Sequence, residues 1–149
     1  MLFSLQDGHL MVTSLSKRSK ALDSLEGLFN VTQNLTSHEI IRETVETDLM
    51  SVEMVCNFNK FSVDLMNEEH HEDAKQAIAD VLLNDGVNIP YIIMKKYDKE
   101  LLVCQLAIRN EKPYWKVIRA SNFTHRELSF FISVLKRAGI YSFAKITRH

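Results

Sequence analysis

Apolar and polar positions alternate along the second half of the chain with the period of a β-strand. Residues two apart lie on the same side of a strand, so strict alternation is typical of strands with one buried face. Two short polar turns, at Asp98-Lys99 and at 110–113, interrupt the alternation. The sequence therefore predicts three consecutive antiparallel strands, over residues 91–97, 100–108 and 114–119.

A helical period is found on either side of these strands. Asn67 can cap a helix that has acids in its first turn. Its apolar stripe comprises Ala74, Ala77, Ile78, Val81 and Leu82. Downstream, Thr124 and Glu127 are spaced as in a capping box, which predicts a helix that Gly139 ends. A last strand is expected over 140–147.

The first 66 residues carry weaker patterns. They predict a hairpin of 2–5 with 10–13 around Asp7-Gly8, a helix over 15–29, a turn over 30–34, a helix from a Ser37 cap to Leu49, and a strand over 54–63.

Together these elements predict a single-domain α+β fold over residues 1–149. Residues 67–149 would form an α-β-β-β-α-β core, in which helices cover one face of an antiparallel sheet of three to four strands. Residues 1–66 would form an acidic, mainly helical region that completes the core, either as part of it or as a separate lobe. The length of 149 residues and the 46% hydrophobic content suit one globular domain.

Charge is distributed unevenly between the two parts of the chain. Residues 1–93 hold six Lys/Arg and fifteen Asp/Glu, a net charge of −9. Residues 94–149 hold twelve Lys/Arg and four Asp/Glu, a net charge of +8. Such asymmetry is a hint of nucleic-acid binding or of an acidic interaction surface. The alternative is that both charges interleave over one globule.

Strand alternation assigns the residues of the predicted sheet to two faces. The core face would carry Ile92, Met94, Leu102, Cys104, Leu106, Ile108, Trp115 and Val117, with Lys96 and Arg119 at strand ends. The second face would carry Tyr91, Ile93, Lys95, Tyr97, Leu101, Val103, Gln105, Tyr114, Lys116 and Ile118. This second face mixes aromatic rings with lysines, which suits stacked bases and phosphates. Alternatively, the N-terminal region covers it.

A nucleic-acid interface would use basic and aromatic residues of the second face and its surroundings. The candidates are Lys95, Tyr97, Tyr114, Lys116, Arg119, Arg126, Lys136 and Arg137. The chain contains no RNP motif, zinc finger or helix-turn-helix pattern that would strengthen this hypothesis.

Catalytic chemistry has little support in the sequence. Residues 68–73 read Glu-Glu-His-His-Glu-Asp and could offer two or three ligands to a divalent cation, but an acidic first turn explains the same residues. No nucleophile elbow or Walker loop is present. Cys56 and Cys104 lack CxxC spacing and are expected to be free and buried. We expect no catalytic residue, metal or cofactor.

Three functional hypotheses follow. The first is a small non-enzymatic binding or regulatory protein that contacts nucleic acid through the basic C-terminal half. The second is a protein–protein adaptor, inhibitor or assembly subunit that uses the acidic N-terminal half, with a homo-oligomer as one form of it. The third is a metal-dependent enzyme using residues 68–73. A cytoplasmic location without membrane contact is expected, because the chain carries neither a signal-peptide pattern nor a long apolar run.

Overall fold

The computed structural model describes residues 2–6, 9–12, 23–33, 49–56, 61–83 and 88–141. Its strands are β1 (Leu2–Gln6), β2 (His9–Val12), β3 (Met50–Cys56), β4 (Phe61–Asp64), β5 (Pro90–Lys96), β6 (Lys99–Arg109), β7 (Lys112–Ala120) and β8 (Phe123–Thr124). Its helices are α1 (Leu25–Gln33), α2 (His71–Leu83) and α3 (His125–Arg137), and a 3₁₀ turn at Glu68–His70 precedes α2.

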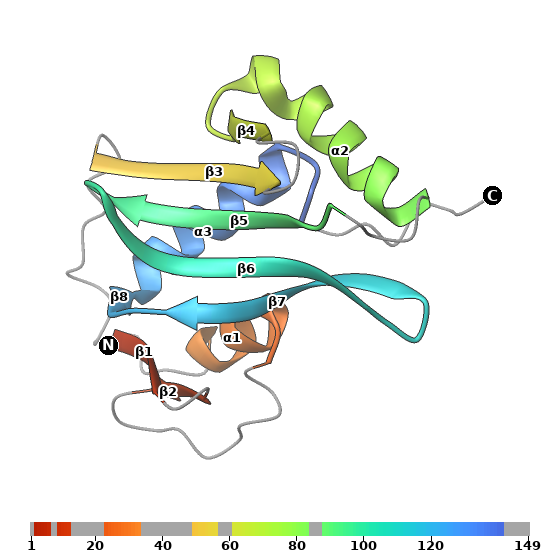
Figure 1. The fold of residues 1–149 in the computed structure, drawn as a ribbon. Coiled ribbons are helices and arrows are strands. Elements are labelled where there is room, and N and C mark those ends of the chain that lie inside the picture. The colour runs from red at the N-terminus through yellow and green to blue at the C-terminus, as the bar shows by residue number, and fades with distance from the viewer. Residues whose placement is uncertain are drawn as a thin grey trace.

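A five-stranded antiparallel sheet with the order β4-β3-β5-β6-β7 forms the centre of the molecule (Figure 1). β3 pairs with both β4 and β5, so strands from the two halves of the chain share one sheet. A smaller sheet with the order β2-β1-β8 joins the N-terminal hairpin to the start of α3. The α+β class is confirmed, with five strands in the main sheet instead of the three to four expected.

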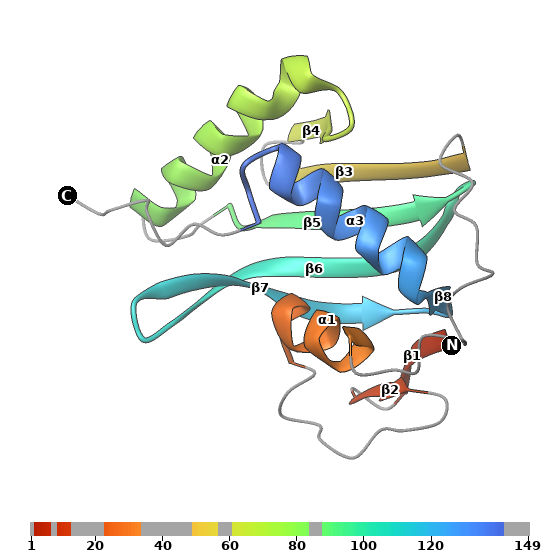
Figure 2. The same ribbon diagram turned by 180° about the vertical axis from the view of Figure 1, so that it is seen from behind.

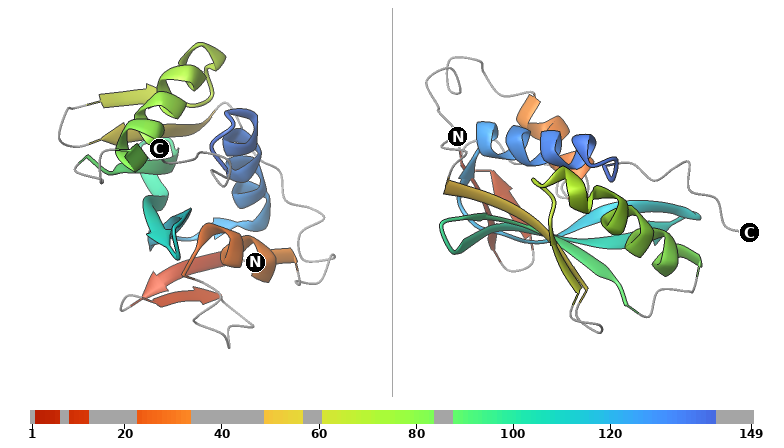
Figure 3. Two further views of the ribbon diagram at one scale, coloured as in Figure 1. Left: turned by 90° about the vertical axis from the view of Figure 1, so that its right-hand side faces the viewer. Right: turned by 90° about the horizontal axis from the view of Figure 1, so that it is seen from above.

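The described helices pack on one face of the main sheet. α3 crosses behind the strands and α1 lies beside it, and the side views place α3 on one side of the sheet (Figures 2 and 3). Leu25 and Leu28 of α1, and Ala74, Ile78 and Leu82 of α2, belong to one buried cluster with the core face of the sheet. We call this the helix side and the opposite surface the second face.

Local sequence signals account for the ends of α3. The Thr124 hydroxyl accepts from the backbone N–H of Glu127 at 3.1 Å, and the Glu127 carboxylate accepts from the backbone N–H of Thr124 at 2.9 Å. This capping box satisfies two donors at the start of the helix. Glu127 also lies 3.5 Å from the ammonium of Lys96. Gly139 has a φ of +75° after the helix, a conformation that favours glycine.

The start of α2 combines a side-chain cap with a tight turn. Asn67 Oδ1 accepts from the backbone N–H of Glu69 at 3.0 Å, as its position suggested. The 3₁₀ turn at 68–70 then leads into α2, and His71 Nε2 lies 2.8 Å from the carbonyl oxygen of Leu65. The helix therefore begins at His71, three residues later than the acids alone would place it.

Several predicted elements of the N-terminal region are corrected by the structure. Its described residues form four strands and one helix, where a mainly helical region was expected. α1 spans Leu25–Gln33, so the end of the predicted helix over 15–29 and the turn over 30–34 were misplaced. Ser24 is the reason, because its hydroxyl accepts from the backbone N–H of Gly27 at 3.0 Å and caps a helix there.

The single strand expected over 54–63 is instead the pair β3 and β4. β3 starts at Met50, inside the residues expected to end a helix, and alternates buried and half-buried positions. The remainder of that helix lies outside the described residues. Ile140 and Tyr141 do not continue into a strand, and the rest of the strand expected over 140–147 is also outside the described part. The N-terminal hairpin is confirmed.

Candidate nucleic-acid interface

The register of the sheet fixes which side chains share the second face. One row runs across the strands as Val55, Tyr91, Gln105 and Lys116, and the next as Glu53, Ile93, Val103 and Arg119. Tyr91 and Gln105 are joined by a hydrogen bond of 3.1 Å from the amide to the phenol oxygen. No helix among the described residues covers this face (Figures 1 and 2).

The interior of the second face is apolar and largely shielded. Leu101 and Val103 are each 5% exposed, and Ile93 and Ile118 are half-buried. The predicted core face is buried from Ile92 to Val117, whereas Ile108 is 47% exposed. The polar groups that remain accessible on the second face therefore lie around this apolar centre.

A basic group with one aromatic ring lies at the β6–β7 end of the second face. The hairpin cluster, as we name it, comprises Arg109, Lys112, Tyr114 and Lys116. Arg109 is paired with Lys112, and Tyr114 and Lys116 follow on the same side of β7. The guanidinium carbon of Arg109 lies 5.3 Å from the centre of the Tyr114 ring.

The three cations of the hairpin cluster are exposed, and none forms an ion pair with a carboxylate of the described residues. Like charges directly opposite each other destabilise a strand pair. The pairing of Arg109 with Lys112 is therefore a local cost that a bound anion would relieve. The turn between them, Asn110-Glu111, has φ values of +52° and +65°, which match the twist of a tight two-residue hairpin.

Two other candidates on the second face are neutralised by carboxylates. Lys95 Nζ lies 2.9 Å from Glu53, and this hydrogen bond, together with the charge of Glu53, raises the pKa of Lys95. Arg119 binds both oxygens of Glu100, at 3.0 Å to Oε2. A bulge between Val103 and Cys104 places Arg119 opposite Val103, so it lies on the second face and not at the end of the core face as expected.

Tyr97 lies far from the hairpin cluster. It is 69% exposed at the β5–β6 turn, with a φ of +54°, and its backbone N–H donates to the carbonyl of Leu49 at 2.9 Å. The whole of β6 separates this turn from the β6–β7 turn (Figure 1). At about 3.3 Å per residue, the two ends of a strand of this length are over 30 Å apart.

The remaining three candidates lie on α3, on the helix side. Arg126, Lys136 and Arg137 are exposed. The Lys136 ammonium lies over two aromatic rings, at 5.2 Å from the centre of Tyr141 and 6.0 Å from that of Phe29. The structure therefore does not bring the eight candidates together. Tyr114 and Lys116 lie in the hairpin cluster, and the others are ion-paired, distant or on the opposite side.

Arg109 and Lys112 were missed by the sequence analysis. The turn was drawn over 110–113, which removed Lys112 from its strand and placed Arg109 outside the preceding one. The available signal was the alternation itself: Arg109 continues the positions 103, 105 and 107, and Lys112 continues 116 and 114 backwards. A two-residue turn is the arrangement that pairs them.

Residues 68–73 do not assemble a set of ligands. Within the described part of the chain, no group of three or more His, Cys, Asp or Glu side chains is placed to hold a metal ion. His71 Nε2 contacts the Leu65 carbonyl, and Glu72 lies 3.2 Å from the ammonium of Lys75. Both cysteines are free and buried, as expected, and burial raises the pKa of each thiol.

Comparison with known proteins finds no matching family model, no matching curated protein and no matching solved structure. None of the helices that the structure describes has the length and apolar character needed to cross a membrane.

Proposed function

We propose that this protein is a non-enzymatic binding protein that contacts single-stranded nucleic acid through the hairpin cluster. The observation that carries the proposal is the gathering of three exposed cations without carboxylate partners around Tyr114. Regularly spaced phosphates are the anions that such a row of cations suits best. Tyr114 adds a ring face beside the cations, and stacking of bases on such rings is typical of single-strand binding.

The charge arrangement sets the expected strength and salt dependence of binding. Three cations that each neutralise one phosphate give a slope of about −2 for the logarithm of affinity against the logarithm of salt concentration. Lys95 and Arg119 add little, because Glu53 and Glu100 already neutralise them. We therefore expect moderate affinity, easily measured at low salt and lost as salt is raised.

Charge reversal in the hairpin cluster is expected to weaken binding of a labelled single-stranded oligonucleotide. Lys112→Glu with Lys116→Glu removes two of the three cations and adds two repulsive charges, so affinity at low salt should fall about tenfold or more. The slope against salt should also become shallower by about 2. Fluorescence anisotropy over a salt series measures both quantities.

Arg126→Glu is the matched control for this variant. It makes a similar change of charge on the helix side, and an acid in the first turn of a helix suits the helix dipole. Affinity should be nearly unchanged. Equal losses in the control and in the hairpin variant would indicate a non-specific effect of net charge. Absence of binding by the unaltered protein at low salt would overturn the proposal.

A protein partner is the second candidate function. Glu68, Glu69, Glu72 and Asp73 are exposed at the start of α2, on an element distant in sequence from the basic hairpin cluster. Complementary charges on one chain could join copies head to tail. Sedimentation velocity without nucleic acid, at low and high salt, tests this. An oligomer that dissociates on adding salt would favour assembly, and a monomer throughout would exclude head-to-tail assembly.

A further inference from the structure

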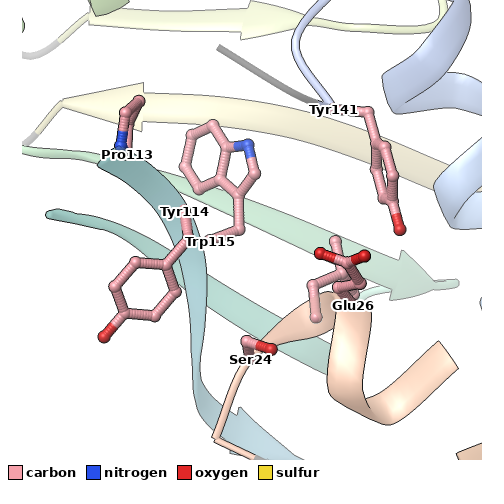
Figure 4. Close-up of a pocket in the computed structure, with 7 residues that line it drawn as sticks. Ser24, Glu26, Pro113, Tyr114, Trp115 and Tyr141 are labelled. Carbon is pink, nitrogen blue, oxygen red and sulfur yellow. The ribbon is translucent and has the colours of Figure 1, made fainter. Parts of the chain in front are cut away.

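A small cavity opens at the free edge of β7, apart from the hairpin cluster. It has a volume of about 270 Å³ and lies between the first turn of α1, the edge of β7 and the residue that follows Ile140 (Figure 4). The residues that matter for its chemistry are Ser24, Glu26, Pro113, Trp115 and Tyr141. Its volume is slightly below the roughly 300–1,000 Å³ of small-molecule sites, which suits a compact group.

Two aromatic side chains form walls of this cavity. Trp115 is 3% exposed, and its indole N–H donates to the carbonyl oxygen of Ile140 at 2.8 Å. This bond holds the segment after α3 against β7 and so positions Tyr141, the next residue. Figure 4 shows the Trp115 and Tyr141 rings on the same side of β7, with the ring of Tyr114 on the other side.

A carboxylate completes the lining. Glu26, in the first turn of α1, is exposed and points toward Tyr141 in Figure 4. Burial, and then the negative charge of Glu26, raises the pKa of the Tyr141 phenol, so the ring stays neutral at physiological pH. No basic side chain of the described residues forms an ion pair with Glu26. The cavity therefore offers ring faces and a single negative charge.

The start of a helix ordinarily favours an anion. Here Ser24 already accepts two of the α1 backbone N–H groups, from Gly27 to its hydroxyl and from Leu28 to its carbonyl, both at 3.0 Å. Glu26 itself supplies the negative charge at this helix end. A second anion would be repelled by that carboxylate, so a cation is the better match for the cavity.

We propose that the cavity between Glu26, Trp115 and Tyr141 binds an alkylated ammonium group. Aromatic faces attract such cations, and the weak hydration of a quaternary ammonium suits walls with few hydrogen-bond acceptors. A hard metal ion would need about six oxygen ligands, and the cavity offers one carboxylate. The group could belong to a free quaternary amine or to an N-methylated lysine side chain, which share this chemistry.

Trp115 is the only tryptophan and reports directly on the site. Titration of the full chain with choline, at constant ionic strength, should give a saturable change in its fluorescence. The neutral isostere 3,3-dimethyl-1-butanol has the same shape without the charge, and it should bind about tenfold more weakly or not at all. Equal responses to both compounds, or no saturable response to choline, would overturn the proposal.

Three variants localise the binding. Glu26→Gln removes the charge at an exposed position and should weaken choline binding about tenfold. Glu111→Gln makes the same change at the β6–β7 turn and should leave the affinity unchanged. Lys136→Gln removes the cation that lies over the Tyr141 ring, so affinity should rise by about twofold as repulsion is lost. Similar affinities for Glu26→Gln and Glu111→Gln would contradict the assignment.

A trimethyl-lysine peptide and its unmethylated counterpart distinguish the two sources of the cation. If the methylated peptide binds more tightly than both choline and the unmethylated peptide, the natural ligand is a protein side chain. If it binds no better than choline, a free amine is indicated. Both results support the proposed site, because each requires the ammonium group to occupy it.

Discussion

Replacing Phe131 with alanine is expected to lower the free energy of unfolding by about 3–5 kcal/mol. Phe131 is fully buried on α3, in the cluster that joins this helix to the core face of the sheet. Its removal takes a large apolar side chain out of the core and leaves a cavity that the neighbouring strands can fill only in part. The loss is a large fraction of the roughly 5–15 kcal/mol that stabilises a typical domain.

Phe130→Ala provides the matched control, because the same side chain is removed one position earlier on the same helix. Phe130 is only half-buried, so the expected loss is about 1–1.5 kcal/mol. Urea unfolding followed by the fluorescence of Trp115 measures both values. If Phe131→Ala does not fold, Phe131→Leu should show an intermediate loss. Equal effects at positions 130 and 131 would contradict the placement of α3.

The elements that the sequence predicted well are those with local, repeated signals. The strands β5 to β7 bury every second residue, so alternation identified both their extent and their core face. The capping box of α3 needs only Thr124 and Glu127, four residues of chain. Such patterns survive folding because their physical cause lies within the element itself.

The failures arose where the decisive contact is distant or irregular. The alternation of β3 is clear from Met50 to Cys56, but helical spacing in the preceding residues obscured its start. One bulge moved Arg119 to the second face, since an extra residue reverses the side that each later side chain takes. Sequence patterns do not reveal a bulge of this kind in advance.

The candidate sites divide in the same way. The hairpin cluster follows from strand period and turn length, so Arg109 and Lys112 could have been found with a two-residue turn. Neutralisation of Lys95 by Glu53 joins residues 42 positions apart and depends on the pairing of β3 with β5. The cavity at the β7 edge brings together residues near 25, 115 and 141. No local pattern links these three segments.

Cys104 is expected to make the protein less stable at alkaline pH. The thiol is fully buried in β6 between Ile92 and Val117, and burial raises its pKa above the ordinary value of 9.0. Below that value the thiol is protonated in both the folded and the unfolded chain, so its contribution to stability is constant. Above it the unfolded chain loses the proton while the folded chain keeps it, and unfolding becomes more favourable.

Comparison of the unaltered protein with Cys104→Ala isolates this contribution. From about pH 8 to about pH 10.5, the thiol should cost the unaltered protein about 2 kcal/mol of unfolding free energy, and the variant should lack that part of the decline. Because each protein is compared with itself at two pH values, the packing lost in the variant cancels. Cys56→Ala should remove a smaller part, since Cys56 lies in β3 at a less deeply buried position. An identical alkaline decline in all three proteins would show that the Cys104 thiol ionises as readily in the folded chain as in the unfolded one, which is incompatible with its place in the core.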